Sequence, residues 1–198
     1  MKFNTKVIHG GQHHDPSTGA VMPPVYQTST FVQTSPGKPL HPDYEYSRAA
    51  NPTRTALENA LASIENGTRG LAFSSGLAAT DCILRSFKAG DEIIAMDDLY
   101  GGTYRMFTRI DKDSGIKFHF VDMNDLDNFK SLINSNTKLV WVETPTNPLM
   151  KLADIQEIAK ITKANNILFA VDNTFATPYL QKPLDLGADI VMHSATKY

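Results

Sequence analysis

Short apolar runs alternate with segments of helical periodicity along most of this chain, from residue 53 to its end. The expected strands cover residues 70–73, 92–96, 117–121, 139–142, 167–171 and 190–192. The expected helices lie between them, as at 125–133, where apolar residues recur every three or four positions. Such alternation is typical of a parallel or mostly parallel sheet with helices on both faces, so we predict an α/β fold.

Residues 1–50 show little periodicity and are rich in proline and glycine. This composition predicts an extended N-terminal arm that buries little apolar surface by itself. Residues 51–198 form the predicted large domain. The chain stops soon after an apolar strand, which is unusual for a complete domain, so we expect it to be the N-terminal part of a longer protein.

Composition excludes several classes of function. The formal net charge is −2 in 198 residues, and no apolar run could span a bilayer, so neither nucleic acid nor a membrane is an expected partner. Cys82 is the single cysteine, which excludes an internal disulfide; we expect it to lie in the core. His13 and His14 are adjacent and cannot face one point, so no metal site is predicted. A cytoplasmic protein is the default expectation.

Two expected strands end in reactive side chains. Lys197 follows strand 190–192 closely, with Ser194 and Thr196 beside it, and Asp172 follows strand 167–171. Ligands bind at the carboxyl ends of strands in open α/β sheets, where a partly desolvated lysine would have a lowered pKa and act as a nucleophile. The ordinary alternatives are an exposed lysine that ends a strand and an aspartate that caps a helix.

Together, these two groups suit pyridoxal phosphate. That cofactor needs a Schiff-base lysine, donors for its phosphate, and a carboxylate that keeps its ring nitrogen protonated. Two further stretches agree with a flat, phosphorylated ligand. Residues 74–80 form a glycine turn before a helix, where free N–H groups can bind phosphate. Tyr100 precedes Gly101 and Gly102, which allow close approach to a ring, although an ordinary turn explains both stretches equally well.

An arginine and a tyrosine close the expected arm. Tyr46 and Arg48 are two residues apart and point the same way if this segment is extended. The planar guanidinium fork of arginine suits a phosphate group. Surface pairing of the two side chains is an equally good explanation of these residues alone.

Four motifs carry a resemblance to a known family. They occur at residues 194–198 (Ser-Ala-Thr-Lys-Tyr), 171–175 (Val-Asp-Asn-Thr-Phe), 143–148 (Glu-Thr-Pro-Thr-Asn-Pro) and 100–103 (Tyr-Gly-Gly-Thr). In this order they resemble the Cys/Met-metabolism family of pyridoxal-phosphate enzymes. The resemblance runs from the arm to the last residue, and it implies the large domain of a fold-type I enzyme, with relatives roughly twice as long.

The resemblance also implies roles for individual residues. It assigns catalysis to Lys197, Tyr100 and Asp172. It assigns cofactor binding to a larger set: Tyr46, Arg48, Ser75, Gly76, Leu77, Tyr100, Asn147, Asp172, Thr174, Ser194, Thr196 and Lys197. Tyr46 and Arg48 would act in trans, from a neighbouring subunit, so the implied protein is a homo-oligomer, either a dimer that shares its active sites or a tetramer.

The implied reaction is γ-elimination or γ-replacement on a sulfur amino acid. Cleavage of cystathionine to cysteine, 2-oxobutanoate and ammonia is the leading expectation. Synthesis of cystathionine from an activated homoserine and cysteine comes next, followed by γ-cleavage of methionine. Methionine γ-lyases typically carry cysteine at the position of Gly102, and we expect this glycine to leave room for the distal arm of cystathionine. A nicotinamide oxidoreductase lacks support because no Gly-x-Gly-x-x-Gly turn is present; a binding protein that has lost catalysis is the non-enzyme alternative.

Overall fold

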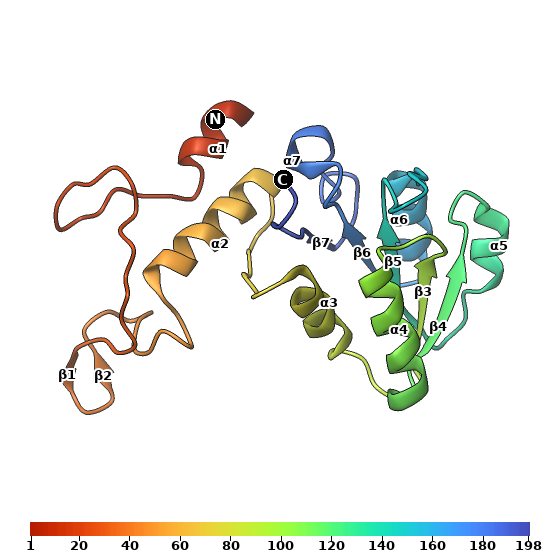
Figure 1. The fold of residues 1–198 in the computed structure, drawn as a ribbon, viewed down its shortest axis with the longest axis horizontal. Helices are drawn as coiled ribbons and strands as arrows, with labels where there is room; N and C mark the ends of the chain where they lie inside the picture. The colour runs from red at the N-terminus through yellow and green to blue at the C-terminus, as the bar shows by residue number, and fades with distance from the viewer. The chain divides into compact units, whose positions relative to one another are not determined.

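The computed structural model describes residues 1–198, which form two compact units (Figure 1). Unit 1 comprises Met1–Ala72 and unit 2 comprises Phe73–Tyr198. Each unit is described by itself below.

Unit 2 is built on a five-stranded sheet in which every neighbouring pair is parallel. Its strands are β3 (Glu92–Met96), β4 (Lys117–Val121), β5 (Thr137–Glu143), β6 (Leu168–Asp172) and β7 (Ile190–Met192), in the order β4-β3-β5-β6-β7. The apolar runs at these positions form the strands because a parallel sheet covered on both faces buries nearly every strand residue. The predicted α/β fold is confirmed.

Helices connect these strands and cover both faces of the sheet. They are α3 (Gly76–Leu84), α4 (Gly101–Ser114), α5 (Leu126–Ser131), α6 (Ile155–Ala164) and α7 (Thr177–Leu180). In Figure 1, α3 and α4 lie together on one side of the sheet, and α5 and α6 lie on the other. The strand order explains this, because the chain moves from β3 to one edge through α4 and then returns past β3 toward the other edge.

The core of unit 2 is centred on β3, β5 and β6, whose apolar side chains are almost completely buried, except that of Leu168 at the start of β6. Trp141 on β5 is fully buried, and the ring of Phe107 from α4 meets it edge-on with 5.6 Å between ring centroids. Phe118 from β4 stacks on the other side of Phe107 at 4.7 Å. The indole N–H of Trp141 has no hydrogen-bond partner. These aromatic contacts join helix α4 to the sheet.

Unit 1 has little regular structure. It contains α1 (Phe3–His9), the short antiparallel strands β1 (Gln33–Ser35) and β2 (Lys38–Pro39), and α2 (Pro52–Glu65). Helix α2 begins where the sequence places it: Asn51 caps the helix by accepting a hydrogen bond from the N–H of Thr53. Apart from β1 and β2, residues 10–51 contain no helix or extended strand, whereas helix α1 was not anticipated because seven residues show too little periodicity.

Two local expectations are wrong. Residues 70–73 join no sheet, and Leu71 and Phe73 are exposed, because three apolar residues beside a glycine find no neighbouring strand to pair with. Cys82 is exposed rather than part of the core. It lies on α3, whose buried residues are Thr80 and Leu84, so the thiol belongs to a different face of that helix.

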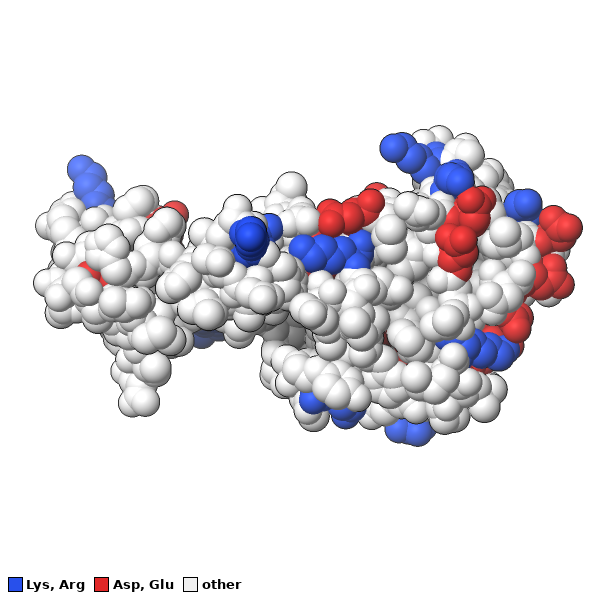
Figure 2. Space-filling view, turned by 90° about the horizontal axis from the view of Figure 1, so that it is seen from above, with Lys and Arg blue, Asp and Glu red and all other residues white.

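The surface carries charges of both signs. On the face shown in Figure 2, Lys and Arg side chains are interspersed with Asp and Glu, with no broad area of one sign. Some oppositely charged residues of unit 2 form ion pairs within one helix or at its end, such as Arg85 with Asp81 and Lys160 with Glu157. None of the helices is both long enough and apolar enough to cross a bilayer.

Candidate active site

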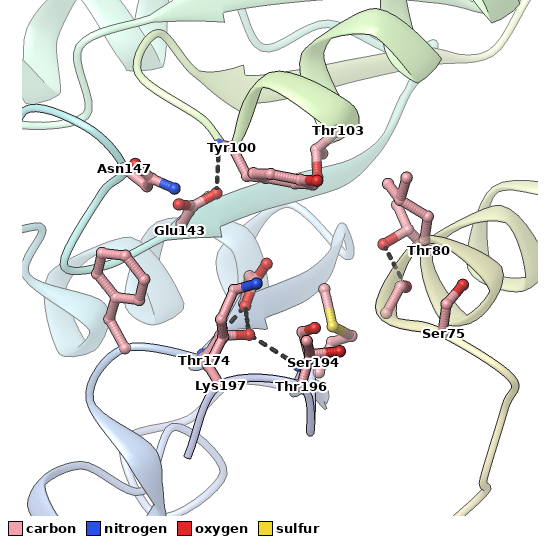
Figure 3. Close-up of a pocket in the computed structure, with 15 residues that line it drawn as sticks. Ser75, Thr80, Tyr100, Thr103, Glu143, Asn147, Thr174, Ser194, Thr196 and Lys197 are labelled. Atoms are coloured by element: carbon pink, nitrogen blue, oxygen red, sulfur yellow. Dashed lines mark hydrogen bonds between the residues drawn. The ribbon is translucent and has the colours of Figure 1, made fainter.

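A pocket of about 230 Å³ opens at the carboxyl edge of the sheet in unit 2 (Figure 3). Ten of the twelve predicted cofactor-binding residues line it: Ser75, Gly76, Leu77, Tyr100, Asn147, Asp172, Thr174, Ser194, Thr196 and Lys197. They come from the segments that follow β3, β5, β6 and β7 and from the start of α3. The carboxyl ends of parallel strands meet at one edge, so residues far apart in the sequence converge there.

The ends of β6 and β7 are joined by a short chain of hydrogen bonds. The Oδ1 atom of Asp172 accepts from the backbone N–H of Thr174 at 3.0 Å and from its hydroxyl at 2.5 Å. The same hydroxyl oxygen accepts from the backbone N–H of Ser194 at 2.9 Å. Asp172 is buried, and this desolvation raises its pKa despite the hydrogen bonds from Thr174, which act in the opposite direction. Its Oδ2 atom takes part in neither of the bonds from Thr174.

Lys197 lies on the wall of this pocket, but it is exposed. The expectation of a partly desolvated lysine immediately after the strand is therefore wrong for this structure. The reason is distance along the chain: β7 ends at Met192, and a turn in which the N–H of Lys197 bonds to the carbonyl of Ser194 brings the side chain back to the pocket. Lys197 and Thr174 both line the pocket, and Figure 3 draws them close together.

The first turn of α3 presents backbone N–H groups to the pocket. Ser75 is the N-cap, and its hydroxyl accepts from the N–H of Ala78, which leaves the N–H groups of Gly76 and Leu77 without helical partners. Gly76 is necessary here because a Cβ atom at this position would lie 2.9 Å from the Cβ of Ser194. The glycine therefore allows α3 to approach the segment after β7, so that both sets of donors face one place.

Tyr100 precedes α4, and its ring lies on the pocket wall. A Cβ atom at Gly102 would lie 2.4 Å from the Cε1 atom of this ring and 3.1 Å from Leu77. The space beside Gly102 is thus filled by Tyr100 and is not free for a substrate arm. This corrects the physical reason given above for Gly102: the glycine accommodates the tyrosine ring.

The loop after β5 places Asn147 on the pocket wall, and hydrogen bonds to Asp98 hold this loop in place. The Oδ2 atom of this buried carboxylate accepts from the hydroxyl of Thr146 at 2.5 Å and from the N–H of Leu149 at 2.9 Å. Asp98 lies in the segment between β3 and α4. Its contacts therefore connect the Asn147 loop to the segment that leads into Tyr100.

Glu143, the last residue of β5, is a second buried carboxyl group in the pocket. It is paired in register with Asp172 on β6, and its Oε2 atom accepts from the backbone N–H of Tyr100 at 2.8 Å (Figure 3). Burial is the main cause that raises the pKa of Glu143 to about 8, and the nearby charge of Asp172 adds to it.

The structure adds five lining residues that were not predicted: Thr80, Thr103, Glu143, Phe175 and Met192. Glu143 could have been found. It follows the apolar run 139–142 just as Asp172 follows its own strand, and the strand-end argument applies to both. Thr80 and Thr103 lie inside helices, and no sequence pattern distinguishes them from other buried threonines.

Tyr46 and Arg48 belong to unit 1, and the pocket contains neither of them. Both are exposed, and the guanidinium carbon of Arg48 lies 4.6 Å from the centre of the Tyr46 ring. The two side chains are paired on the surface, which is the alternative left open above, although residues 47–49 form a turn and not an extended segment. Their role toward a cofactor phosphate remains a prediction.

Comparison with known proteins shows which family this chain is similar to. The sequence profile of the Cys/Met metabolism PLP-dependent enzymes matches residues 4–198. A cystathionine beta-lyase of Lactococcus lactis subsp. cremoris is 55% identical over 196 residues, which are 99% of this chain and 51% of that protein. A Bacillus subtilis protein named cystathionine gamma-synthase/O-acetylhomoserine (thiol)-lyase is 53% identical over 194 residues, with 98% and 52% of the two chains covered.

Solved structures agree with the sequence comparison. The crystal structure of cystathionine gamma-lyase from Lactobacillus plantarum, complexed with L-serine, superposes with a TM-score of 0.95 at 49% identity. It covers 100% of this chain, and this chain covers 51% of it. The chain thus spans about half the length of the relatives it matches. With a family profile that matches nearly every residue, the chain belongs to the Cys/Met metabolism PLP-dependent enzymes.

Proposed function

We propose that the pocket binds pyridoxal phosphate, the cofactor after which the family is named. The residues present fit this group. The N–H groups of Gly76 and Leu77 and the hydroxyls of Ser194 and Thr196 are hydrogen-bond donors suited to a phosphate. Gly76 supports the fit independently, because any side chain there would collide with Ser194 where the donors converge.

Asp172 is suited to the ring nitrogen of the cofactor. Its Oδ1 atom is occupied by Thr174, so its Oδ2 atom is the one available to a ligand. When bound, pyridoxal phosphate supplies an electron sink that stabilises negative charge at the substrate carbon next to the amino group. Asp172 would hold a proton at the ring nitrogen, and its burial would strengthen this charge-assisted hydrogen bond.

Lys197 and Tyr100 are suited to proton transfer. The amine of Lys197 would hold the cofactor covalently and, after substrate displaces it, carry protons at its Nζ atom, which is the only amine lining the pocket. Tyr100 would place its ring against that of the cofactor and its hydroxyl near the leaving group. Asn147, half-buried at the end of its loop, would donate to an oxygen of cofactor or substrate.

We propose cleavage of cystathionine at the γ-carbon, giving cysteine, 2-oxobutanoate and ammonia, as the activity of the whole protein. The observation that carries this proposal is the convergence of Lys197, Asp172 and Tyr100 on one pocket in a member of this family. A sulfur amino acid is the substrate class that the relatives' names share.

Two related reactions use the same half of the site. The relatives include a protein named cystathionine beta-lyase, which favours cleavage on the other side of the sulfur atom, giving homocysteine, pyruvate and ammonia. Another is named a gamma-synthase, which favours γ-replacement from an activated homoserine and cysteine.

Product analysis tests the proposal. The full-length protein is given cystathionine alone, and 2-oxobutanoate and pyruvate are separated by chromatography, with methionine as a comparison substrate. We expect 2-oxobutanoate in excess and a lower kcat/KM for methionine. Excess pyruvate would establish the β-cleavage instead. As the control, Lys197→Ala should lose turnover and the visible absorbance of bound cofactor while it keeps its far-UV circular dichroism.

A shared active site in a homo-oligomer is the second part of the proposal. Tyr46 and Arg48, exposed and paired in unit 1, would reach the cofactor phosphate of a neighbouring subunit. Arg48→Ala should weaken retention of the cofactor. Mixing inactive Arg48→Ala and Lys197→Ala subunits should restore one competent site per hybrid dimer. Sedimentation as a monomer, or no activity after subunit exchange, would contradict this arrangement.

A further inference from the structure

Glu143 is the one buried acid of the pocket for which the proposed chemistry has no use. It ends β5 at the centre of the sheet, is 5% exposed, and forms no ion pair with a Lys, Arg or His side chain. A buried carboxyl group without a cationic partner is costly to a fold, so its presence calls for a physical reason.

The contacts of Glu143 point to Tyr100. Its Oε2 atom accepts from the backbone N–H of Tyr100 at 2.8 Å, across 43 residues of sequence. Tyr100 is the N-cap of α4 and has no side-chain capping bond of its own. The backbone N–H of Asn147 makes a weaker interaction with the same carboxyl group. Glu143 thus touches the backbone of the two residues whose side chains would face a ring in the pocket.

The charges around Glu143 favour its neutral form. Asp172 is its register partner on β6, and Asp98 approaches from the segment after β3. Lys197, after β7, and the phenol of Tyr100 are the other titratable groups on the pocket wall, and His193 lies next to Asp172. Burial raises the pKa of Glu143 to about 8, with a smaller contribution from the charges of Asp172 and Asp98, and this favours the protonated form at neutral pH.

We propose that Glu143 is a positioning residue, which holds the backbone of Tyr100 through its Oε2 atom and thereby sets the placement of the tyrosine ring against the cofactor. Its Oε2 atom stays an acceptor for the N–H of Tyr100, and its proton leaves it without a net charge beside Asp172. The tightness of the arrangement supports this, because even a Cβ atom at Gly102 would lie 2.4 Å from the Cε1 atom of the ring. This inference rests on the proposed binding of pyridoxal phosphate.

The first test replaces the acid by its neutral isostere. Glu143→Gln keeps an oxygen acceptor for the N–H of Tyr100, whereas Glu143→Ala removes it. We expect the Gln variant to keep cofactor affinity and the visible circular dichroism of bound cofactor within about twofold. A displacement of about 1 Å can cost about 100-fold in rate, so the Ala variant should lose about that factor in kcat and change the dichroic band.

The second test asks whether Glu143 acts through Tyr100. In the Tyr100→Ala background, a further Glu143→Ala change should have little effect on the dichroic band, because the ring it positions is gone. Equal effects of Glu143→Ala with and without Tyr100 would contradict the inference. So would a Glu143→Gln variant as impaired as Glu143→Ala, or a Glu143→Ala variant with wild-type rate and dichroism.

The third test needs no cofactor. The folded-state pKa of about 8 lies above the unfolded value of 4.5, so the folded protein binds more protons between these values, and its stability should fall as the pH rises through this window. The urea midpoint of the wild type should therefore fall relative to that of Glu143→Gln from pH 5 to pH 8. If the midpoints of the two proteins change with pH in the same way, Glu143 is not protonated in the folded protein. Wild-type protein that binds no pyridoxal phosphate would contradict the proposed function, and this inference with it.

Discussion

The two units of this chain differ in what holds them together. In unit 2, the side chains of β3, β5 and β6 fill a continuous core. In unit 1, only Gly10, Asp15 and Glu65 are buried, and none of them is a large apolar residue. Valines, leucines and methionines of the arm are exposed instead, among them Val21, Met22, Val25, Val32 and Leu40.

Unit 1 is organised by polar contacts in place of a core. Asp15 accepts hydrogen bonds from the hydroxyls of Ser17 and Thr18, and the hydroxyl of Thr53 donates to the carbonyl of Pro24. Such bonds each contribute only about 0.5–1.5 kcal/mol net, whereas the burial of a large apolar side chain contributes about 1.5–3 kcal/mol. The comparison teaches that sequence changes of the same chemical type should have very different consequences in the two units.

The largest expected effect is in the core. Leu139 on β5 is fully buried and Leu40 in the arm is 68% exposed. Leu139→Ala should lower the free energy of unfolding by about 2–5 kcal/mol because it leaves a cavity, whereas Leu40→Ala should stay within about 0.5 kcal/mol. Urea unfolding followed by far-UV circular dichroism measures both. Equal losses would show that the arm is buried in the native assembly.

Removal of a buried carboxylate comes next. Asp98 accepts bonds from residues 48 and 51 positions away, whereas the partners of Asp15 lie within three positions. Asp98→Ala should cost about 1.5–3 kcal/mol and weaken cofactor binding, because the Asn147 loop loses its attachment. Asp15→Ala should leave the main unfolding transition unchanged. A loss from Asp15→Ala as large as that from Asp98→Ala would break the distinction between long-range and local contacts.

Helix caps provide a finer comparison. Asp154 caps α6 by accepting from the N–H of Glu157, and Asn51 caps α2 in the same manner. Asp154→Ala should cost about 1 kcal/mol in the cooperative unfolding of unit 2. Asn51→Ala should instead increase amide hydrogen exchange within α2, with no shift of that transition. A shift of similar size in both variants would show that the two units unfold together.

The smallest expected effect concerns acid stability. Hydrogen bonds from Asn134 and then His119 hold the pKa of Glu92 below its ordinary value of 4.5. Because the folded-state pKa is the lower one, Glu92 stabilises the fold above pH 4.5 and loses this contribution as the pH falls through its folded value. Glu92→Gln should therefore make the urea midpoint of unit 2 less dependent on pH below 4.5. A pH dependence equal to that of the wild type would contradict this prediction.

The strands and the pocket of unit 2 could be predicted because one rule covers both. Apolar runs such as 139–142 and 167–171 predict buried strands. Reactive residues at the ends of such strands converge at the carboxyl edge of the sheet. That rule places Asp172 in the pocket correctly, whereas Asn147 is expected there from the resemblance to the family. The rule also applies to Glu143, to which the resemblance assigns no role.

What could not be predicted depends on neighbours that the sequence does not name. The run at 70–73 resembles a strand, yet no partner lies beside it. The exposure of Lys197 depends on the turn after β7, and the reason for Gly102 depends on where the Tyr100 ring lies. All three features depend on which residues become neighbours in the folded chain, and periodicity and residue type do not contain that information.

The fluorescence of Trp141 reports on the folding of unit 2. This residue is the single tryptophan of the chain, and it lies wholly inside unit 2, with no exposed surface and no hydrogen bond to its indole N–H. Its emission should be blue-shifted in the native state and move to the red only when the sheet opens. Tryptophan fluorescence is therefore silent about residues 1–72, and melting of that unit must be followed by circular dichroism or amide hydrogen exchange.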